Sequence, residues 1–321
     1  MQTTNKSIYQ KWSENYAALP LFFYPWWLDA VCGSEHWEVA LVLNANNELE
    51  GVLPFYKTKK RGLSWSSMPV LTPYLGPLLV YPNKISSSQR YAFDKRVMNA
   101  LIDQLPNFFY FQQNWHPDFQ NWLPFYWRNF QQTTYYTYTF PHIRKPDRLF
   151  QRFKSATRNH IRVASREYTI EENGTLADFF ELNKKVFTQQ HISIPYDLSF
   201  LQKIDDLLKP RKWRKLLLAY SEERGAYEAG VYIVRDEHTA YLLASGRNPD
   251  SHSGAVPLLI WHALQQLSEE VERFDFEGSV IPGIEVFFRS FGAELTPYFQ
   301  LRKGRYRWVE SLKLLLGKRQ K

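Results

Sequence analysis

The sequence predicts a mixed α/β protein made of two similar units. Three observations support this prediction. Hydrophobic residues (44%) and charged residues (22%) occur in ordinary globular proportions, one order of elements occurs twice along the chain, and the composition becomes strongly basic near residue 145. A length of 321 residues suits two domains.

The first half contains a helical segment, two apolar segments joined by a polar turn, and a later strand, helix and strand. The turn at Asn44–Asn47 between the two apolar segments indicates a β-hairpin. The predicted elements are, in order, residues 26–31, 37–43, 48–56, 75–81, 91–105 and 108–112.

The second half repeats this order. Its hairpin spans residues 215–234, and aligning the two hairpins places Gly230 beside Gly51. A strand follows at residues 240–245. The next helix, over 256–271, has apolar residues at the 3.6-residue spacing of one buried face: Ile260, Leu264, Leu267 and Val271. A strand over 274–277 completes the second unit, so each unit is predicted to have a central mixed sheet flanked by helices.

The segment Phe108–Phe140 connects the two repeats and has 15 aromatic residues among 33. We interpret it as an interdomain core and connecting strands rather than a base-stacking platform, since such platforms need interleaved cations. Pro141 and Pro146 then interrupt the chain. We therefore predict two domains, residues 1–145 and 146–321.

The formal net charge of +8 is concentrated in two segments, +6 over residues 142–167 and +7 over residues 300–321. Such segments fit phosphate-rich partners: coenzyme A, tRNA, an undecaprenyl-linked precursor or an anionic membrane. The alternative is that they are solvated helix faces. In the first segment, Arg158, Asn159 and Arg162 lie in rows on a predicted helix, a geometry suited to holding an anionic substrate.

A polar, glycine-containing loop precedes the helix that begins near residue 256. Ser253, Gly254 and Ala255 are therefore candidate contacts for the phosphate groups of a cofactor, because the first N–H groups of a helix attract anions. The alternative is an ordinary helix start without a ligand.

Strand alternation over 274–277 places Asp275 and Glu277 on one side of the predicted strand. Either carboxylate is a candidate catalytic base for an attacking amine. The alternative is that they cap the next helix or pair with Arg289.

Several function classes lack their sequence signatures. HExxH, GxSxG, GxxxxGK[ST] and a strand-associated GxGxxG do not occur, so a catalytic metal, a hydrolase elbow and common nucleotide loops are not predicted. The single cysteine, Cys32, excludes internal disulfides. Neither a signal-peptide pattern nor a membrane-spanning segment is visible, so we expect a cytoplasmic protein.

The sequences TRNHIRVASRE, GAVPLLIWHAL and FDFEGSVIPGIEVFFRSFGAELTPYFQLRK resemble the FemAB-type acyltransferases, tandem-GNAT proteins that include peptidoglycan aminoacyltransferases. The resemblance is densest between Arg158 and Lys303. Motif matches fall on Arg158, Asn159, Ile161, Arg162, Ala164, Asp275, Phe276, Gly278, Phe291, Gly292 and Ala293.

This resemblance implies two GNAT-like domains with the donor site in the second, residues 146–321. It also implies an aminoacyl-tRNA or acyl-CoA donor and an amine acceptor such as a peptidoglycan precursor. We add Tyr298, in the same segment, to the predicted substrate-binding residues. The usual GNAT pyrophosphate loop is absent, since SHSGAV keeps only its Gly–Ala pair, and this departure argues against acetyl-CoA.

We therefore predict an N-acyltransferase in which Arg158, Asn159 and Arg162 hold a donor or acceptor and Asp275 or Glu277 handles the amine. One alternative is an acetyl-CoA-dependent N-acetyltransferase of a small molecule or protein. Another is a non-catalytic module that binds RNA or an anionic membrane. Its membrane contact would be a C-terminal amphipathic helix containing Trp308, Leu312 and Leu315.

Overall fold

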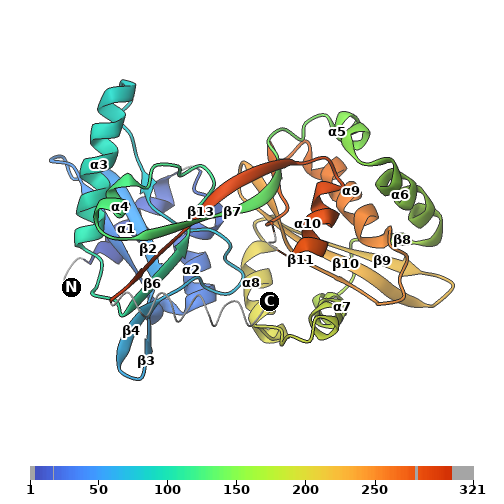
Figure 1. Cartoon of the computed structure of the whole chain (residues 1–321). Helices are drawn as coiled ribbons and strands as arrows, with labels where there is room; N and C mark the ends of the chain where they lie inside the picture. Colours follow the sequence, from blue (N-terminus) through green and yellow to red (C-terminus); the bar gives the residue numbers. More distant parts are fainter. Residues whose placement is uncertain (1–3, 17, 279–280, 306–321) are drawn as a thin grey trace. The chain divides into compact units, whose positions relative to one another are not determined.

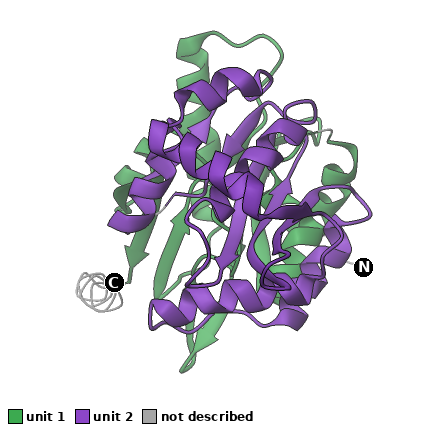
Figure 2. Ribbon diagram, turned by 90° about the vertical axis from the view of Figure 1, so that its right-hand side faces the viewer, with its two compact units in different colours: residues 1–135, 297–321 green, residues 136–296 purple. Residues whose placement is uncertain are grey.

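The computed structural model describes residues 4–16, 18–278 and 281–305. The chain forms two compact units, unit 1 (residues 1–135 and 297–321) and unit 2 (residues 136–296), coloured separately in Figure 2. It passes between them twice, inside the strands β7 (Gln131–Phe140) and β13 (Glu294–Gly304). The first passage precedes the prolines that suggested a boundary at residue 145. The predicted C-terminal amphipathic helix lies outside the described residues.

Unit 1 has two groups of strands (Figure 1). One contains β1, β2 and β5 in antiparallel order, and the other contains β3, β4, β6 and β13. The elements of unit 1 before β7 are α1 (Asn5–Asn15), α2 (Pro25–Cys32), β1 (Trp37–Leu43), β2 (Leu49–Tyr56), β3 (Thr58–Lys60), β4 (Leu63–Ser66), β5 (Leu78–Leu79), α3 (Ser87–Asp103), β6 (Tyr110–Asn114) and α4 (Leu123–Trp127). The predicted hairpin is confirmed, since Trp37 pairs with Tyr56.

Aromatic rings from the connecting segment form much of the core of unit 1. Phe111, Trp115 and Phe125 are at most 2% exposed, and they pack with Leu53 of β2 and Val97 of α3. These rings are therefore core residues of unit 1, whereas the sequence analysis assigned them to an interdomain core. Burial of such large side chains supplies most of the hydrophobic stabilisation available to a unit of this size.

Unit 2 is a mixed sheet with the strand order β7-β12-β11-β10-β9-β8, in which β11 and β12 are parallel. Its elements between β7 and β13 are α5 (Pro146–Arg152), α6 (Ser155–Glu167), β8 (Thr169–Glu171), α7 (Leu176–Gln189), α8 (Leu198–Leu208), β9 (Arg214–Ser221), β10 (Ala226–Arg235), β11 (Thr239–Arg247), α9 (Ala255–Leu267), β12 (Arg273–Asp275) and α10 (Pro282–Arg289). The predicted mixed α/β fold class is confirmed.

Helices cover both faces of this sheet. Seven consecutive residues of β10 are buried, the pattern of a strand packed on two sides. Tyr232 faces α7, where it contacts Phe179, whereas Val231 packs with Leu259 of α9. Figure 1 shows α7 and α9 on opposite sides of β9–β11.

β11 separates from its parallel neighbour part-way along its length. The pairing with β12 runs from Thr239 opposite Arg273 to Tyr241 opposite Asp275, whereas β11 continues to Arg247. The C-terminal part of β11 therefore has backbone groups that β12 does not pair. It is held instead by α7, because the backbone of Leu182 and Asn183 lies directly against Gly246.

Within the described residues, no helix is long and apolar enough to cross a membrane. The same part of the chain has no group of three or more His, Cys, Asp and Glu residues placed to hold a metal ion.

Gly246→Ala should destabilise the protein by about 1–3 kcal/mol, because the added methyl group would force the backbones of β11 and α7 apart. Its new Cβ would lie 2.3 Å from the Asn183 backbone nitrogen. Urea unfolding measures the change. Gly283→Ala is the control, since a Cβ there meets nothing within 4 Å and alanine favours the helix. Equal stability of the two variants would contradict the proposed contact.

Candidate functional site

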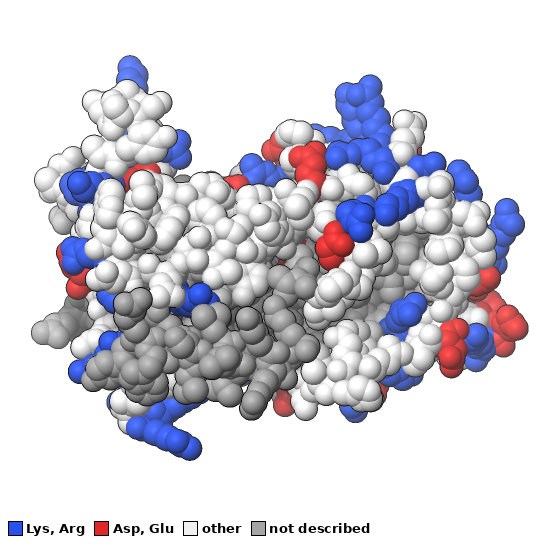
Figure 3. All heavy atoms as spheres, viewed as in Figure 1, with Lys and Arg blue, Asp and Glu red and all other residues white. Residues whose placement is uncertain are grey.

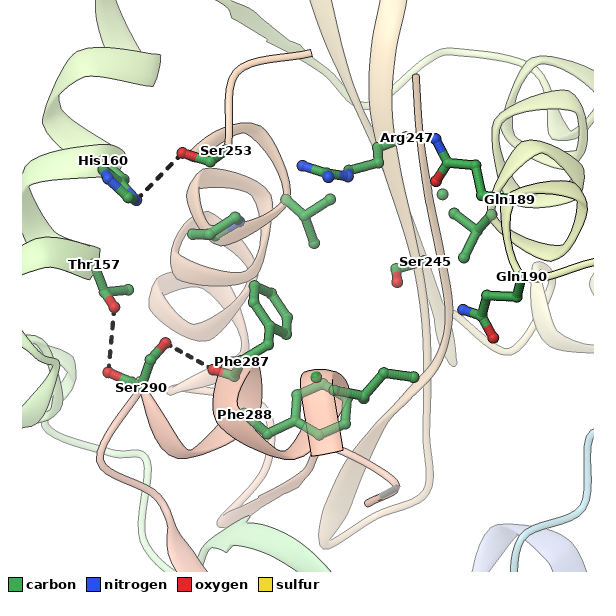
Figure 4. A pocket seen from close by; sticks show the side chains of 16 residues that line it. Thr157, His160, Gln189, Gln190, Ser245, Arg247, Ser253, Phe287, Phe288 and Ser290 are labelled. Atoms are coloured by element: carbon green, nitrogen blue, oxygen red, sulfur yellow. Dashed lines mark hydrogen bonds between the residues drawn. The ribbon is translucent and has the colours of Figure 1, made fainter. Parts of the chain in front are cut away.

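Unit 2 contains a cavity of about 470 Å³ beside the separated part of β11 (Figure 4). It is lined from five elements: α6, α7, β11, the start of α9, and α10. One side is apolar, with Val256, Phe287 and Phe288. Among the described lining residues there is no Asp or Glu, so the charged groups available to a ligand are Arg247 and, when protonated, His160.

Arg247 is the last residue of β11, and its side chain points across the cavity toward Ser253 (Figure 4). It is half-buried, and within the described residues its guanidinium has neither a hydrogen bond nor an ion pair. A guanidinium in this setting favours a phosphate or carboxylate ligand, which it contacts through two parallel hydrogen bonds. The sequence analysis did not select Arg247. Its position at the end of a predicted strand, just before the loop that leads into a helix, could have indicated an anion-binding residue.

The three residues predicted at the start of α9 have different surroundings. Ser253 lines the cavity, and its hydroxyl lies 3.3 Å from His160 Nδ1. Gly254 lies where α6 crosses α9, because an added Cβ would be 2.2 Å from the His160 carbonyl oxygen. The N–H groups of Gly254 and Ala255 already donate to His252, at 3.0 Å each.

The predicted basic residues lie on α6. Arg158 donates to the backbone carbonyls of Gln151 and Phe153 and so closes the end of α5. Asn159 and Arg162 are exposed on the same helix. Figure 3 shows Lys and Arg side chains gathered over α5 and α6. The α6 residues that line the cavity are Thr157 and His160. Arg158, Asn159 and Arg162 lie outside it, so a ligand bound by these three side chains would lie on the protein surface.

Asp275 is buried at the end of β12, where its Oδ1 accepts hydrogen bonds from the Thr137 hydroxyl at 2.5 Å and the Glu277 N–H at 2.8 Å. The strand ends at Asp275, two residues earlier than expected. Glu277 has a left-handed backbone with φ of 52°, so strand alternation does not extend to it. The Asp275 carboxylate stabilises this turn.

The Glu277 carboxyl has no described partner for its buried Oε1 atom. Burial raises the pKa of this carboxyl well above its ordinary value, and the neighbouring Asp275 charge raises it further. A buried acid with a raised pKa and a strained backbone is typical of functional sites. Its position next to Ser279 and Val280, outside the described residues, leaves its full surroundings open.

Two buried side chains connect the cavity wall to the region of Glu277. The Tyr196 hydroxyl donates to Asn183 Oδ1, and Asn183 Nδ2 donates to the Ser245 carbonyl, both at 2.7 Å. Ser245 lines the cavity. Burial raises the pKa of Tyr196, and the charge of Glu277 contributes to this shift. These hydrogen bonds fix the end of β11 to α7.

Tyr298, the remaining predicted residue, belongs to unit 1. Its ring stacks on Tyr135 with centroids 5.8 Å apart and meets Tyr74 edge-on at 5.2 Å. The cavity described above is lined by residues of unit 2. A substrate-binding role for Tyr298 stays a prediction.

Residues 148–289 match the family model described as the acetyltransferase (GNAT) domain. This part of unit 2 is therefore similar to GNAT acetyltransferase domains. The match covers α5 to α10 and therefore every element that lines the cavity. It confirms the prediction of an acyltransferase. No curated protein sequence matches the chain significantly.

Solved structures show the same fold over nearly the whole chain. FemX is 15% identical with a TM-score of 0.65, covering 93% of this chain and 96% of FemX. L-PGS from Bacillus licheniformis is 11% identical with a TM-score of 0.54, covering 96% and 94%. The C-terminal domain of a putative lysylphosphatidylglycerol synthetase from Agrobacterium fabrum is 9% identical with a TM-score of 0.51, covering 86% of each chain. The predicted FemAB-like architecture is confirmed.

Glu277→Gln should change how stability depends on pH. A carboxyl whose folded-state pKa is raised stabilises the fold below its unfolded pKa of about 4.3, and this contribution is lost as pH rises through the raised value. Wild type should therefore lose stability relative to Glu277→Gln as the pH rises above about 4.3, the unfolded-state pKa. Urea unfolding across this range measures the difference, and parallel curves would contradict the assignment.

Proposed function

We propose that the protein transfers an aminoacyl group from tRNA to an amine, with the donor's phosphate-bearing end in the cavity of unit 2. The observation that carries this proposal is Arg247, whose guanidinium has no partner among the described residues, in a cavity to which those residues contribute no carboxylate. A phosphate near the reactive ester would neutralise it, while the apolar wall would contact the base or the acyl group.

Aminoacyl-tRNA is the preferred donor for two reasons. The fold is shared with FemX and with L-PGS, and the family resemblance of the sequence includes aminoacyl-tRNA users. The second reason is the exposed basic face of α5 and α6, which adjoins the cavity through Thr157 and His160 (Figure 3). Closely spaced cations of this kind bind the phosphodiester backbone of RNA.

The acceptor that this family resemblance suggests is an amine of a peptidoglycan precursor, met in the cytoplasm where charged tRNA is present. In this proposal Arg158, Asn159 and Arg162 act at the surface, with Asn159 and Arg162 in contact with RNA phosphates and Arg158 supporting the α5–α6 junction. Ser253 contributes a hydroxyl to the donor site.

The transfer needs a neutral amine and hydrogen-bond donors for the oxyanion. Glu277 is the proposed base: it takes a proton from the acceptor ammonium. The amine nitrogen then forms a bond to the ester carbonyl carbon, and the bond from that carbon to the ribose oxygen breaks. The ribose oxygen takes up the proton that Glu277 had received, and the nitrogen releases its second proton to solvent, so that an ammonium and an ester give an amide, an alcohol and one proton. Backbone N–H groups on the unpaired edge of β11 are the proposed oxyanion donors.

Acetyl transfer from acetyl-CoA is the second candidate function, because the matched family model is described as an acetyltransferase domain. The two candidates differ in the donor. Transfer of a radiolabelled amino acid from charged tRNA to a precursor peptide, with no product from acetyl-CoA, would support the first. Product from acetyl-CoA alone would replace it with the second.

Arg247→Ala should raise the KM for charged tRNA about ten- to a hundredfold, the effect of losing a charge-assisted hydrogen-bonding group. Steady-state kinetics at fixed acceptor concentration measure this change. Lys203→Ala is the control, because it removes one exposed positive charge of unit 2 away from the cavity. An unchanged KM in Arg247→Ala would remove Arg247 from the donor site.

Glu277→Gln should lower kcat about 10²–10⁴-fold, the usual contribution of a general base. Asp275→Asn keeps an acceptor for the turn but removes the charge that raises the pKa of Glu277. The acid limb of its pH–rate profile should therefore move to lower pH. A full rate in Glu277→Gln would assign the proton transfer to another group.

A further inference from the structure

His252 occupies the hydrogen-bonding groups at the start of α9. Its Nδ1 accepts the Gly254 N–H at 3.0 Å, and its carbonyl oxygen accepts the Ala255 N–H at 3.0 Å. Its own N–H donates to the Tyr168 hydroxyl at 3.0 Å, which fixes the loop to the end of α6. Because Nδ1 accepts a hydrogen bond, the ring in this arrangement is the neutral form with its proton on Nε2.

The first N–H groups of a helix bind phosphate when they are unpaired. At α9 few are available. Ala255 donates to the backbone of His252, Gly254 donates to its imidazole, and Pro257 in the first turn has no N–H. A pyrophosphate, which needs several adjacent donors, therefore meets a side-chain acceptor where it would place an oxygen.

We propose that His252 is a specificity-determining residue that excludes pyrophosphate-bearing donors, such as coenzyme A thioesters, from the start of α9. The inference rests on the proposed function and deepens it by stating how the donor is selected. A ligand with a single phosphate is held between the Arg247 guanidinium at the end of β11 and the Ser253 hydroxyl in the loop before α9, and it does not require the blocked N–H groups.

Neighbouring contacts hold the imidazole in this position. Its ring meets the His160 ring edge-on, with centroids 5.9 Å apart, and His160 in turn approaches the Ser253 hydroxyl. Gly254 cannot move toward α6, because His160 backbone atoms already lie against it. Rotation of the imidazole would leave the Gly254 N–H without this acceptor. The arrangement in which His252 occupies that N–H is therefore the favoured one.

Isothermal titration with inorganic pyrophosphate and with coenzyme A tests the inference on the full-length protein. His252→Ala frees the Gly254 N–H and leaves space beside it, so both probes should bind at least tenfold more tightly than to wild type. His252→Asn keeps an acceptor, since an Asn side chain readily accepts the N–H two residues later. It should behave like wild type. His142→Ala, which removes an exposed imidazole elsewhere, is the control.

The inference would be overturned if wild type, His252→Ala and His252→Asn all had the same affinity for coenzyme A and all had the same affinity for pyrophosphate. This holds whether that binding is tight or absent. Gain of binding in His252→Asn as well as His252→Ala would also overturn it, because the acceptor would then not be the cause. These titrations require no turnover. The transfer assay with charged tRNA tests the proposed function separately, so the two can fail independently.

Discussion

The close approach of α7 to the end of β11 is the constraint on which the site depends. Gly246 lets the helix backbone contact the strand, and Asn183 holds the Ser245 carbonyl. Because β11 has left β12 after Tyr241, these contacts replace the missing strand pairing. They hold this part of the strand beside the cavity, where an unpaired sheet edge could otherwise pair with another strand. The positions of Ser245 and Arg247 follow from this arrangement.

Most polar groups around the cavity already have internal partners. Tyr196 and Asn183 support β11, Asp275 supports the turn after β12, and His252 caps the start of α9. Within the described residues, Arg247 has no partner and Glu277 has an unpartnered carboxyl oxygen. An unpaired polar group in a buried setting costs stability unless a ligand completes it. The Arg247 guanidinium suits an anionic donor, and the Glu277 carboxyl suits the amine of an acceptor.

Sequence patterns predicted the features that depend on neighbouring residues. The hairpins, the buried face of α9 and the basic segment follow from alternation, helical spacing and local composition. Features that depend on distant contacts were not accessible. The guanidinium row on α6 gave no sign that Arg158 would close α5, and strand alternation gave no sign that Thr137 and Asp275 would turn the chain before Glu277. Arg247 could be recognised as a candidate only from the structure, in which residues of α6, α7 and α10 line the same cavity.

The repeated plan of the two units explains why the site lies in the second. Gly51 and Gly230 occupy matching hairpin strands, and each omits a Cβ where a helix side chain packs closely: Val97 in unit 1 and Phe179 in unit 2. The strand after the hairpin differs. β5 has two residues, whereas β11 has nine. The additional length carries Ser245, Gly246 and Arg247 beyond the last pair with β12, so the longer strand supplies one wall of the cavity.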